Sequence, residues 1–116
     1  CVAQPTMMVK ANILKQYRYS EDQKNIEDYD LWLRMLGDGL TIDKIPQPLL
    51  NYRVHSTSVT QNDLQQKNPF FKVFDCKRKY LTSCFKQKKW GSFQARVGLF
   101  ALRDLGIGIL KNLKNK

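Results

Sequence analysis

The sequence lacks the short motifs that mark common nucleotide-dependent and hydrolytic sites. It has no glycine-rich phosphate loop, no Gly-x-Ser-x-Gly nucleophile elbow and no Asp-x-Asp pair to hold a nucleotide-bound metal. Its single histidine, His55, has no cysteine cluster to complete a zinc site. These residues by themselves are therefore not expected to bind a nucleotide or a catalytic metal.

Long apolar runs and pairable cysteines are also missing. Arg103 and Asp104 interrupt the apolar stretch 97–110, which falls short of the ~20 residues that a membrane-spanning helix needs. The three cysteines are an odd number, and Cys76 and Cys84 on one helix would be separated by about 12 Å of rise, too far for a disulfide. Reduced thiols predict a cytoplasmic protein.

Positive charge is present in excess, and it is confined to one half of the chain. The formal net charge is +10, yet residues 1–60 hold seven basic and seven acidic side chains, so the whole excess lies in residues 61–116. We predict a division into two parts at this boundary. The basic part either binds an anionic membrane or packs as a helical hairpin with solvated lysines; nucleic acid is the weaker alternative because no binding motif accompanies the charge.

Hydrophobic periodicity predicts an α/β fragment followed by a mainly helical basic tail. The expected strands are 6–9, 40–45 and 49–55, with a loop at 17–26 and a hydroxyl-rich turn at 56–60 that leads to a short helix. The expected helices are 10–16, 27–36, one that starts at Asn68-Pro69 and carries an apolar stripe through Phe85, and 92–105, with a frayed end at 111–116.

Three carboxylates crowd the start of the expected helix 27–36, namely Glu27, Asp28 and Asp30. Carboxylates at this position interact with the exposed N–H groups and the helix dipole, and capping is the simpler interpretation of the motif in isolation. The alternative is a general base, which must reach within ~3 Å of a substrate hydroxyl.

Arg53 and His55 share one face of the expected strand 49–55, because successive strand side chains alternate. Together they could hold a diphosphate, with the arginine donating through its planar fork. Without other support, a partly exposed strand edge is the simpler interpretation.

Three runs in this order resemble the C-terminal part of family 2 nucleotide-sugar glycosyltransferases. They are Gln-Pro-Thr-Met-Met at 4–8, Ile-Glu-Asp-Tyr-Asp-Leu-Trp-Leu-Arg at 26–34 and Ile-Pro-Gln-Pro-Leu-Leu-Asn-Tyr-Arg-Val-His-Ser at 45–56. The resemblance covers roughly residues 1–60 and implies part of a GT-A α/β domain. In that family the preceding half binds the nucleotide sugar and carries an Asp-x-Asp motif for Mg²⁺ or Mn²⁺. The chain starts with Cys rather than Met, so we expect a fragment that is inactive alone.

The resemblance also implies roles for individual residues. Asp28 matches the catalytic base, which takes the proton of an acceptor hydroxyl as it attacks the anomeric carbon with inversion. Arg53 and His55 match a stretch near the diphosphate or its metal. The residues implied to shape or support the acceptor site are Glu27, Asp30, Trp32 and Gln4. Relatives often have His where this chain has Gln4 and Gly-Gly-Tyr where it has Tyr-Arg-Tyr at 17–19, so the acceptor is expected to differ.

The resulting hypothesis is a fragment of an inverting, bacterial-type glycosyltransferase. Its implied partners are a nucleotide-sugar donor and a polysaccharide or lipid-linked acceptor of the cell envelope. The expected location is cytoplasmic, with residues 61–116 as a candidate contact with the inner face of the membrane. The alternative hypothesis is a non-catalytic basic helical module that binds anionic membrane.

Overall fold

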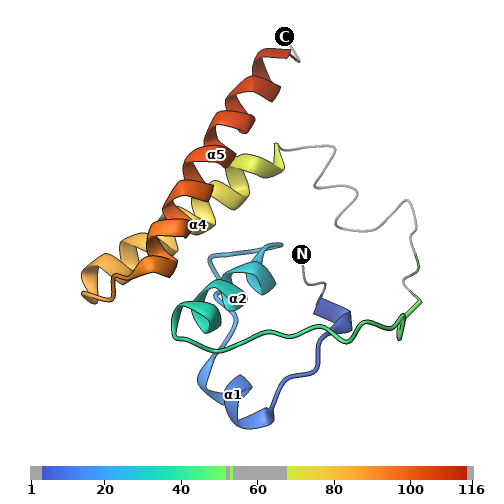
Figure 1. Ribbon diagram of the computed structural model, residues 1–116. Coiled ribbons are helices and arrows are strands. Elements are labelled where there is room, and N and C mark those ends of the chain that lie inside the picture. The colour runs from blue at the N-terminus through green and yellow to red at the C-terminus, as the bar shows by residue number, and fades with distance from the viewer. Residues whose placement is uncertain (1–3, 52, 54–67, 115–116) are drawn as a thin grey trace.

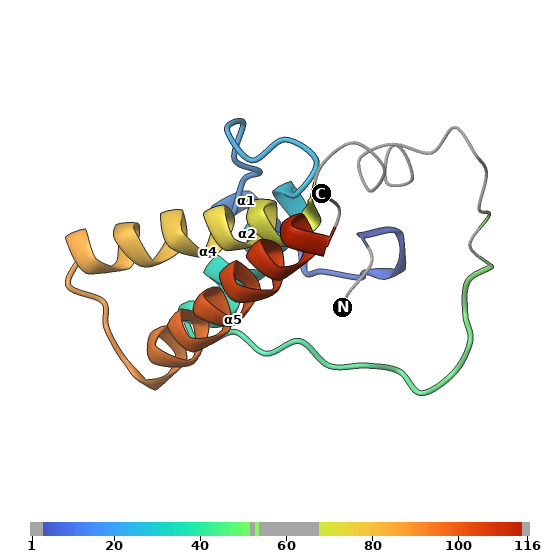
Figure 2. The same ribbon diagram turned by 90° about the horizontal axis from the view of Figure 1, so that it is seen from above.

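The computed structural model describes residues 4–51, 53 and 68–114, and the regular structure in these ranges is helical. Along this part of the chain lie η1 (Gln4–Thr6), α1 (Ala11–Gln16), α2 (Glu27–Gly37), α4 (Pro69–Lys86) and α5 (Ser92–Lys114). Helices α4 and α5 lie together above α2, and α1 lies below α2 (Figure 1). Seen from above, α5 crosses α4 (Figure 2). None of the helices in the described ranges is long and apolar enough to cross a membrane.

Helix α2 begins at its acidic run and ends at its glycines, as the sequence predicts. Its first turn is acidic and Arg34 lies in its last turn, and both suit the helix dipole. The helix ends in a Schellman motif, in which the Leu40 N–H donates to the Met35 carbonyl at 3.0 Å. Gly39 supports this turn with a left-handed φ of 88°, which glycine adopts without strain. The predicted helix 27–36 is confirmed and extends by one residue.

Helices α4 and α5 form an antiparallel hairpin (Figure 1). The Asn68 side chain caps α4 by accepting the Phe70 N–H at 3.2 Å, and Pro69 occupies the first helical position. The same Asn68 side chain donates to the Gly108 carbonyl of α5 at 2.9 Å. The predicted helix start at Asn68-Pro69 is confirmed, and its cap also joins the two arms of the hairpin.

A buried ion pair sets how these helices pack. The ammonium group of Lys77 donates to the carboxylate of Asp104, and the two residues are only 5% and 2% exposed. Arg103 also reaches Asp104, at 3.2 Å. The Lys77 nitrogen lies 5.9 Å from the ring centroid of Tyr29 in α2 and 5.7 Å from that of Phe100 in α5. Buried charges are tolerated only when paired, so this contact favours one arrangement of α2, α4 and α5.

Two apolar clusters lie on opposite faces of α2. The first joins α2 to the hairpin and consists of Ile26, Leu33, Cys76, Tyr80, Cys84 and Val97. The second consists of Leu31, Trp32 and Met35, covered by Met7, Val9, Ile13, Tyr17, Leu40 and Ile42. The described parts on either side of residue 60 thus share a core, while the predicted boundary itself lies outside the described residues.

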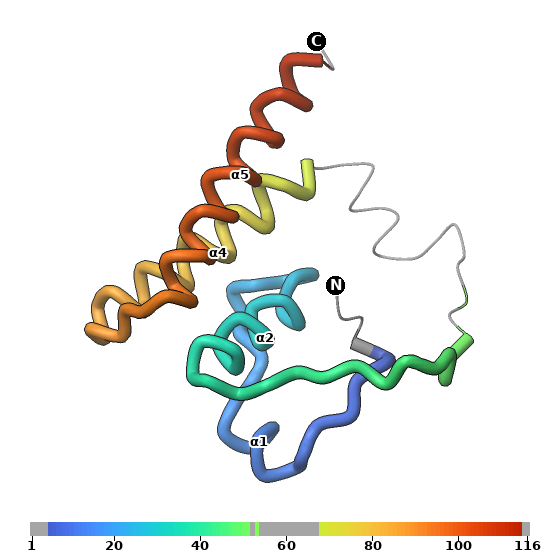
Figure 3. Tube along the Cα trace, viewed as in Figure 1, coloured from blue at the N-terminus to red at the C-terminus, as the bar shows by residue number. Residues whose placement is uncertain are grey.

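The predicted α/β fold class is wrong for the described residues, which contain neither a strand nor a sheet. Strands need neighbouring strands to pair their backbone groups, and the described part of the chain supplies none. Segments 7–10 and 40–45 instead lie in irregular conformations that pack single apolar side chains onto α2. The chain after α2 runs extended and away from the hairpin (Figure 3). Residues 49–51 and 53 have no regular structure, and the rest of the third predicted strand, the turn 56–60 and the short helix lie outside the described residues.

The predicted end of the last helix near residue 105 is also wrong, because α5 continues to Lys114. The continuation contains Gly106 and Gly108, and glycine disfavours a helix. Gly108 is buried, and a Cβ there would lie 3.0 Å from the Phe71 ring, so the glycine permits close helix packing that offsets its low helix propensity. Phe85, expected within the apolar stripe, is 77% exposed.

Candidate functional site

The loop that precedes α2 is fastened to the first two turns of that helix. Buried Asp30 accepts hydrogen bonds from the Ser20 hydroxyl at 2.7 Å and from the Arg34 Nε at 2.9 Å. Arg34 also donates through Nη2 to the Arg18 carbonyl at 2.6 Å. Charge-assisted hydrogen bonds of this kind are strong, so Asp30 acts here as a brace for residues 18–20. Its predicted role of shaping or supporting the acceptor site stays a prediction.

A tight turn brings the loop back to the helix start. Asn25 adopts a left-handed φ of 64°, which asparagine tolerates better than most residues. The Ile26 N–H donates to the Gln23 carbonyl at 3.0 Å, and both residues are buried. The predicted loop 17–26 is thus confirmed as an irregular but well-packed segment.

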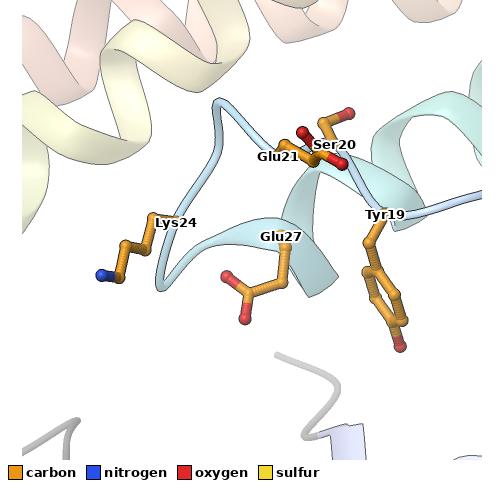
Figure 4. Close-up of a pocket in the computed structure, with 5 residues that line it drawn as sticks. All are labelled: Tyr19, Ser20, Glu21, Lys24 and Glu27. Atoms are coloured by element: carbon orange, nitrogen blue, oxygen red, sulfur yellow. The ribbon is translucent and has the colours of Figure 1, made fainter.

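The loop and the start of α2 border a pocket of about 240 Å³ that is open to solvent. It is lined by Tyr19, Ser20, Glu21, Lys24 and Glu27. The Glu27 carboxylate lies between the side chains of Lys24 and Tyr19 (Figure 4). Its Oε2 atom is buried and accepts no hydrogen bond from the described residues. Because an unpartnered buried carboxylate oxygen is costly, Glu27 is suited to accept a hydrogen bond from a ligand hydroxyl.

Asp28 follows Glu27 in α2 but does not line this pocket. Its Oδ1 atom accepts the Tyr29 N–H at 2.7 Å, and the residue is half-buried. Consecutive helical residues point about 100° apart, so Asp28 and Glu27 project from different faces of α2. The observed contact satisfies one free N–H of the first turn, as the capping interpretation expects. Its role as a base stays a prediction.

Trp32 belongs to the core. It is 7% exposed and packs with Leu31 and Met35 on the face of α2 that looks away from the hairpin. Its indole Nε1 is buried and donates to no described residue. Leu33 is buried in the first cluster, against the hairpin. Packing therefore accounts for Leu33, whereas the free N–H of Trp32 leaves its predicted acceptor-site role open.

The remaining predicted site residues are not brought to the pocket by any described contact. Gln4 begins η1, and its side chain lies outside the described part of the structure. Arg53 is exposed, and among the described residues no hydrogen bond or ion pair joins it to 27–30. His55 lies outside the described residues. The predicted pairing of Arg53 with His55 stays a prediction.

A metal site is not assembled in the described ranges, where no group of three or more His, Cys, Asp or Glu side chains is placed to hold an ion. The donor set of these residues therefore does not fit Mg²⁺ or Mn²⁺.

Sequence reasoning connected Tyr19 with the acceptor through the run 17–19 but missed three other pocket residues, Ser20, Glu21 and Lys24. They lie in a segment that reads only as a polar loop. The Ser20–Asp30 hydrogen bond could have been suspected, because Asp30 is an acid on an otherwise apolar part of the helix. The fold-back at Asn25 has no comparable signal.

Comparisons with known proteins show similarity to glycosyltransferases over part of the chain. The chain is 41% identical over 66 residues to the O-antigen biosynthesis glycosyltransferase WbnJ of Escherichia coli, a match that covers 55% of this chain and 26% of that protein. It is 42% identical over 50 residues to an uncharacterized glycosyltransferase of Methanocaldococcus jannaschii, covering 43% of this chain and 17% of the relative. The chain thus spans about a quarter or less of these relatives. No family profile and no solved structure matches it.

Proposed function

We propose that this chain is the acceptor-side part of a glycosyltransferase that moves a sugar from a nucleotide-sugar donor to a hydroxyl of a polysaccharide or glycolipid. The observation that carries the proposal is the identity of about two residues in five to two glycosyltransferases, together with carboxylates fixed at the start of α2. The proposed reaction inverts the anomeric carbon, as in the family 2 enzymes that the three sequence runs resemble. A Mg²⁺ or Mn²⁺ ion, held by residues other than those described, would neutralise the leaving diphosphate.

Asp28 is the proposed general base. It would accept the proton of the acceptor hydroxyl while the hydroxyl oxygen bonds to the anomeric carbon and the nucleoside diphosphate leaves. Its Oδ1 atom is anchored by the Tyr29 N–H, which fixes the orientation of the carboxylate. A carboxylate held this way loses little side-chain entropy when the acceptor arrives.

The pocket beside Asp28 is the proposed place for part of the acceptor sugar. Glu27 offers a free carboxylate oxygen to a sugar hydroxyl, and the half-exposed ring of Tyr19 (45% exposed) offers an apolar face to the C–H surface of a sugar. Asp30 and Arg34 support this pocket through residues 18–20 without lining it. In this proposal Glu27 binds the acceptor sugar and Asp28 takes the proton of the reacting hydroxyl.

The test is a pair of isosteric substitutions in the full-length enzyme. Asp28→Asn keeps an oxygen that can accept the Tyr29 N–H but cannot take a proton, so kcat should fall about 10²–10⁴-fold while donor affinity is kept. Glu27→Gln should raise KM for the acceptor with a smaller change in kcat, because it weakens a binding contact.

Asp43→Asn is the matched control. Asp43 is an exposed carboxylate outside the pocket whose described contact is with the N–H of Lys44. Initial rates at varied acceptor concentration measure all three variants. Near-normal turnover of Asp28→Asn would overturn the assignment of the base, and a loss equal to that of Asp43→Asn would do the same.

A further inference from the structure

Helix α5 has an apolar face that the rest of the described structure leaves uncovered. The buried residues of its inner face include Val97, Ala101, Asp104 and Gly108. On the outer face, large apolar side chains that are 47–69% exposed fall within one arc of the helix at 100° per residue. This α5 apolar stripe consists of Leu99, Leu102, Ile109, Leu110 and Leu113. Exposed leucines scattered over a surface would not share one face of a helix. An apolar stripe of this length therefore indicates a surface that contacts another molecule.

A row of positive side chains runs beside the stripe. Arg96, Arg103 and Lys114 are exposed and, at 100° per residue, fall along one edge of it. We name these three residues the α5 basic edge. The single acid of α5, Asp104, is buried and pairs with both Lys77 and Arg103, so at this edge it contacts Arg103 alone, and no ion pair among the described residues joins it to Arg96 or Lys114. The outer face of α5 is therefore apolar and positive, with no negative charge.

The charge of the whole chain decides between occupants of this face. A second copy would bring together two chains of net charge +10, with the excess concentrated in residues 61–116 of each. Like charges within a Debye length of about 10 Å repel, so self-association through this face is opposed. An anionic lipid surface has the complementary charge, and it also accepts apolar side chains at the boundary between headgroups and acyl chains.

We propose that α5 lies in the plane of an anionic bilayer, with the stripe inserted below the headgroups and the basic edge among the lipid phosphates. The C-terminal half of α5 extends above the other helices, so it can meet a flat surface without disturbing them (Figure 1). Long arginine and lysine side chains can reach the headgroups while their stems stay in apolar surroundings. The inference goes beyond the proposed transferase and does not depend on it.

The test measures partition of the 116-residue chain onto vesicles of phosphatidylcholine with and without phosphatidylglycerol. Co-sedimentation should need the anionic lipid and should weaken as salt is raised. Leu102→Gln with Leu110→Gln should lower the partition coefficient about tenfold or more, because two apolar side chains no longer enter the bilayer. Arg96→Gln with Lys114→Gln should lower it about tenfold or more on anionic vesicles, at roughly fivefold per charge.

Leu49→Gln is the matched control for the leucines, because Leu49 is 70% exposed on the segment after α2. Lys10→Gln with Lys15→Gln is the control for charge, since both residues are exposed near α1. Glutamine is a good helix former, and circular dichroism checks that each variant is folded.

Four results would overturn the proposal. The first two are equal binding to neutral and anionic vesicles, and no binding to either. The third is stripe variants that bind like Leu49→Gln, and the fourth is a wild-type dimer that the stripe variants convert to monomer without any effect of lipid. Because no sugar substrate is present, failure here leaves the proposed transferase untouched, and Asp28→Asn should partition like the wild type.

Discussion

Gly37, at the end of α2, lies against the Tyr80 side chain of α4. A Cβ at this position would lie 1.9 Å from the Tyr80 hydroxyl. Tyr80 cannot easily yield, because it is buried, accepts a hydrogen bond from the Gln94 amide at 3.0 Å and packs edge-on against Phe93. We expect Gly37→Ala to lower the free energy of unfolding by about 1–3 kcal/mol through overpacking. Urea denaturation measures the change.

Gly106 supplies the control for this prediction. It lies within α5, and a Cβ there would meet nothing within 4 Å. Gly106→Ala should therefore raise the free energy of unfolding by about 0.5–1 kcal/mol, because alanine restricts the unfolded chain and adds no clash. Equal effects of the two substitutions would contradict the packing argument.

The individual residues of the candidate site could be predicted from the sequence only in part. The acidic run at 27–30 is visible in the sequence because its residue types suit a helix start. The different contacts of these acids are not visible in the sequence, because they depend on residues that are neighbours only in the folded chain. Asp30 contacts Ser20 and Arg34, whereas Glu27 lines the pocket. Adjacent acids of similar chemistry acquire different roles from a 100° step and a folded loop.

Among the elements, the α4–α5 hairpin depends on one side chain at its open end. Asn68 accepts the Phe70 N–H and donates to the Gly108 carbonyl, so it caps one helix and holds the other. We expect Asn68→Ala to lower the free energy of unfolding by about 2 kcal/mol, from about 1 for the cap and about 1 for the bond between helices. Chemical denaturation followed by helical circular dichroism measures it.

Asn112→Ala is the matched comparison for this element. Asn112 accepts a hydrogen bond from Asn68 at 3.2 Å in an exposed position, and removing it should cost no more than about 0.5 kcal/mol. If both variants lose the same stability, the cap and the bond to Gly108 contribute nothing beyond the surface contact, and the interpretation of Asn68 is wrong.

The helices were predictable as elements because each carries its own signals. The Asn68-Pro69 start and the apolar repeat of 27–36 depend on residues close in sequence. The strands were not predictable in this way. A segment such as 40–45 becomes a strand only when another strand pairs with it, and the described residues offer no such partner. The length of α5 was also hidden, because Gly108 disfavours helix locally and is retained by contact with Phe71 from another helix.

For the molecule as a whole, the neutral part and the basic part meet in a shared core. Tyr29 of α2 and Cys76 of α4 are neighbours there, and Lys77 reaches the ring of Tyr29. The charge asymmetry therefore does not divide the described residues into independent bodies. Positive charge is carried outward on the hairpin while apolar residues from both parts pack inside, which leaves the site at the α2 start on one side and the α5 apolar stripe on another.

This shared core should make the whole molecule sensitive to alkali. Burial raises the pKa of Tyr29 from 10.0 to about 12 and that of Cys76 from 9.0 to about 12, because a charged phenolate or thiolate would lose its hydration there. Both groups bind protons more tightly when folded, so their stabilising contribution is complete below pH 9 and is lost as the pH rises toward 12. The free energy of unfolding, measured with urea from pH 8 to 11, should fall above pH 9. Tyr29→Phe should reduce the fall above pH 10 and leave the parts due to Cys76 and to Tyr80, whose pKa burial also raises. An unchanged slope would mean that Tyr29 does not contribute to the pH dependence of stability.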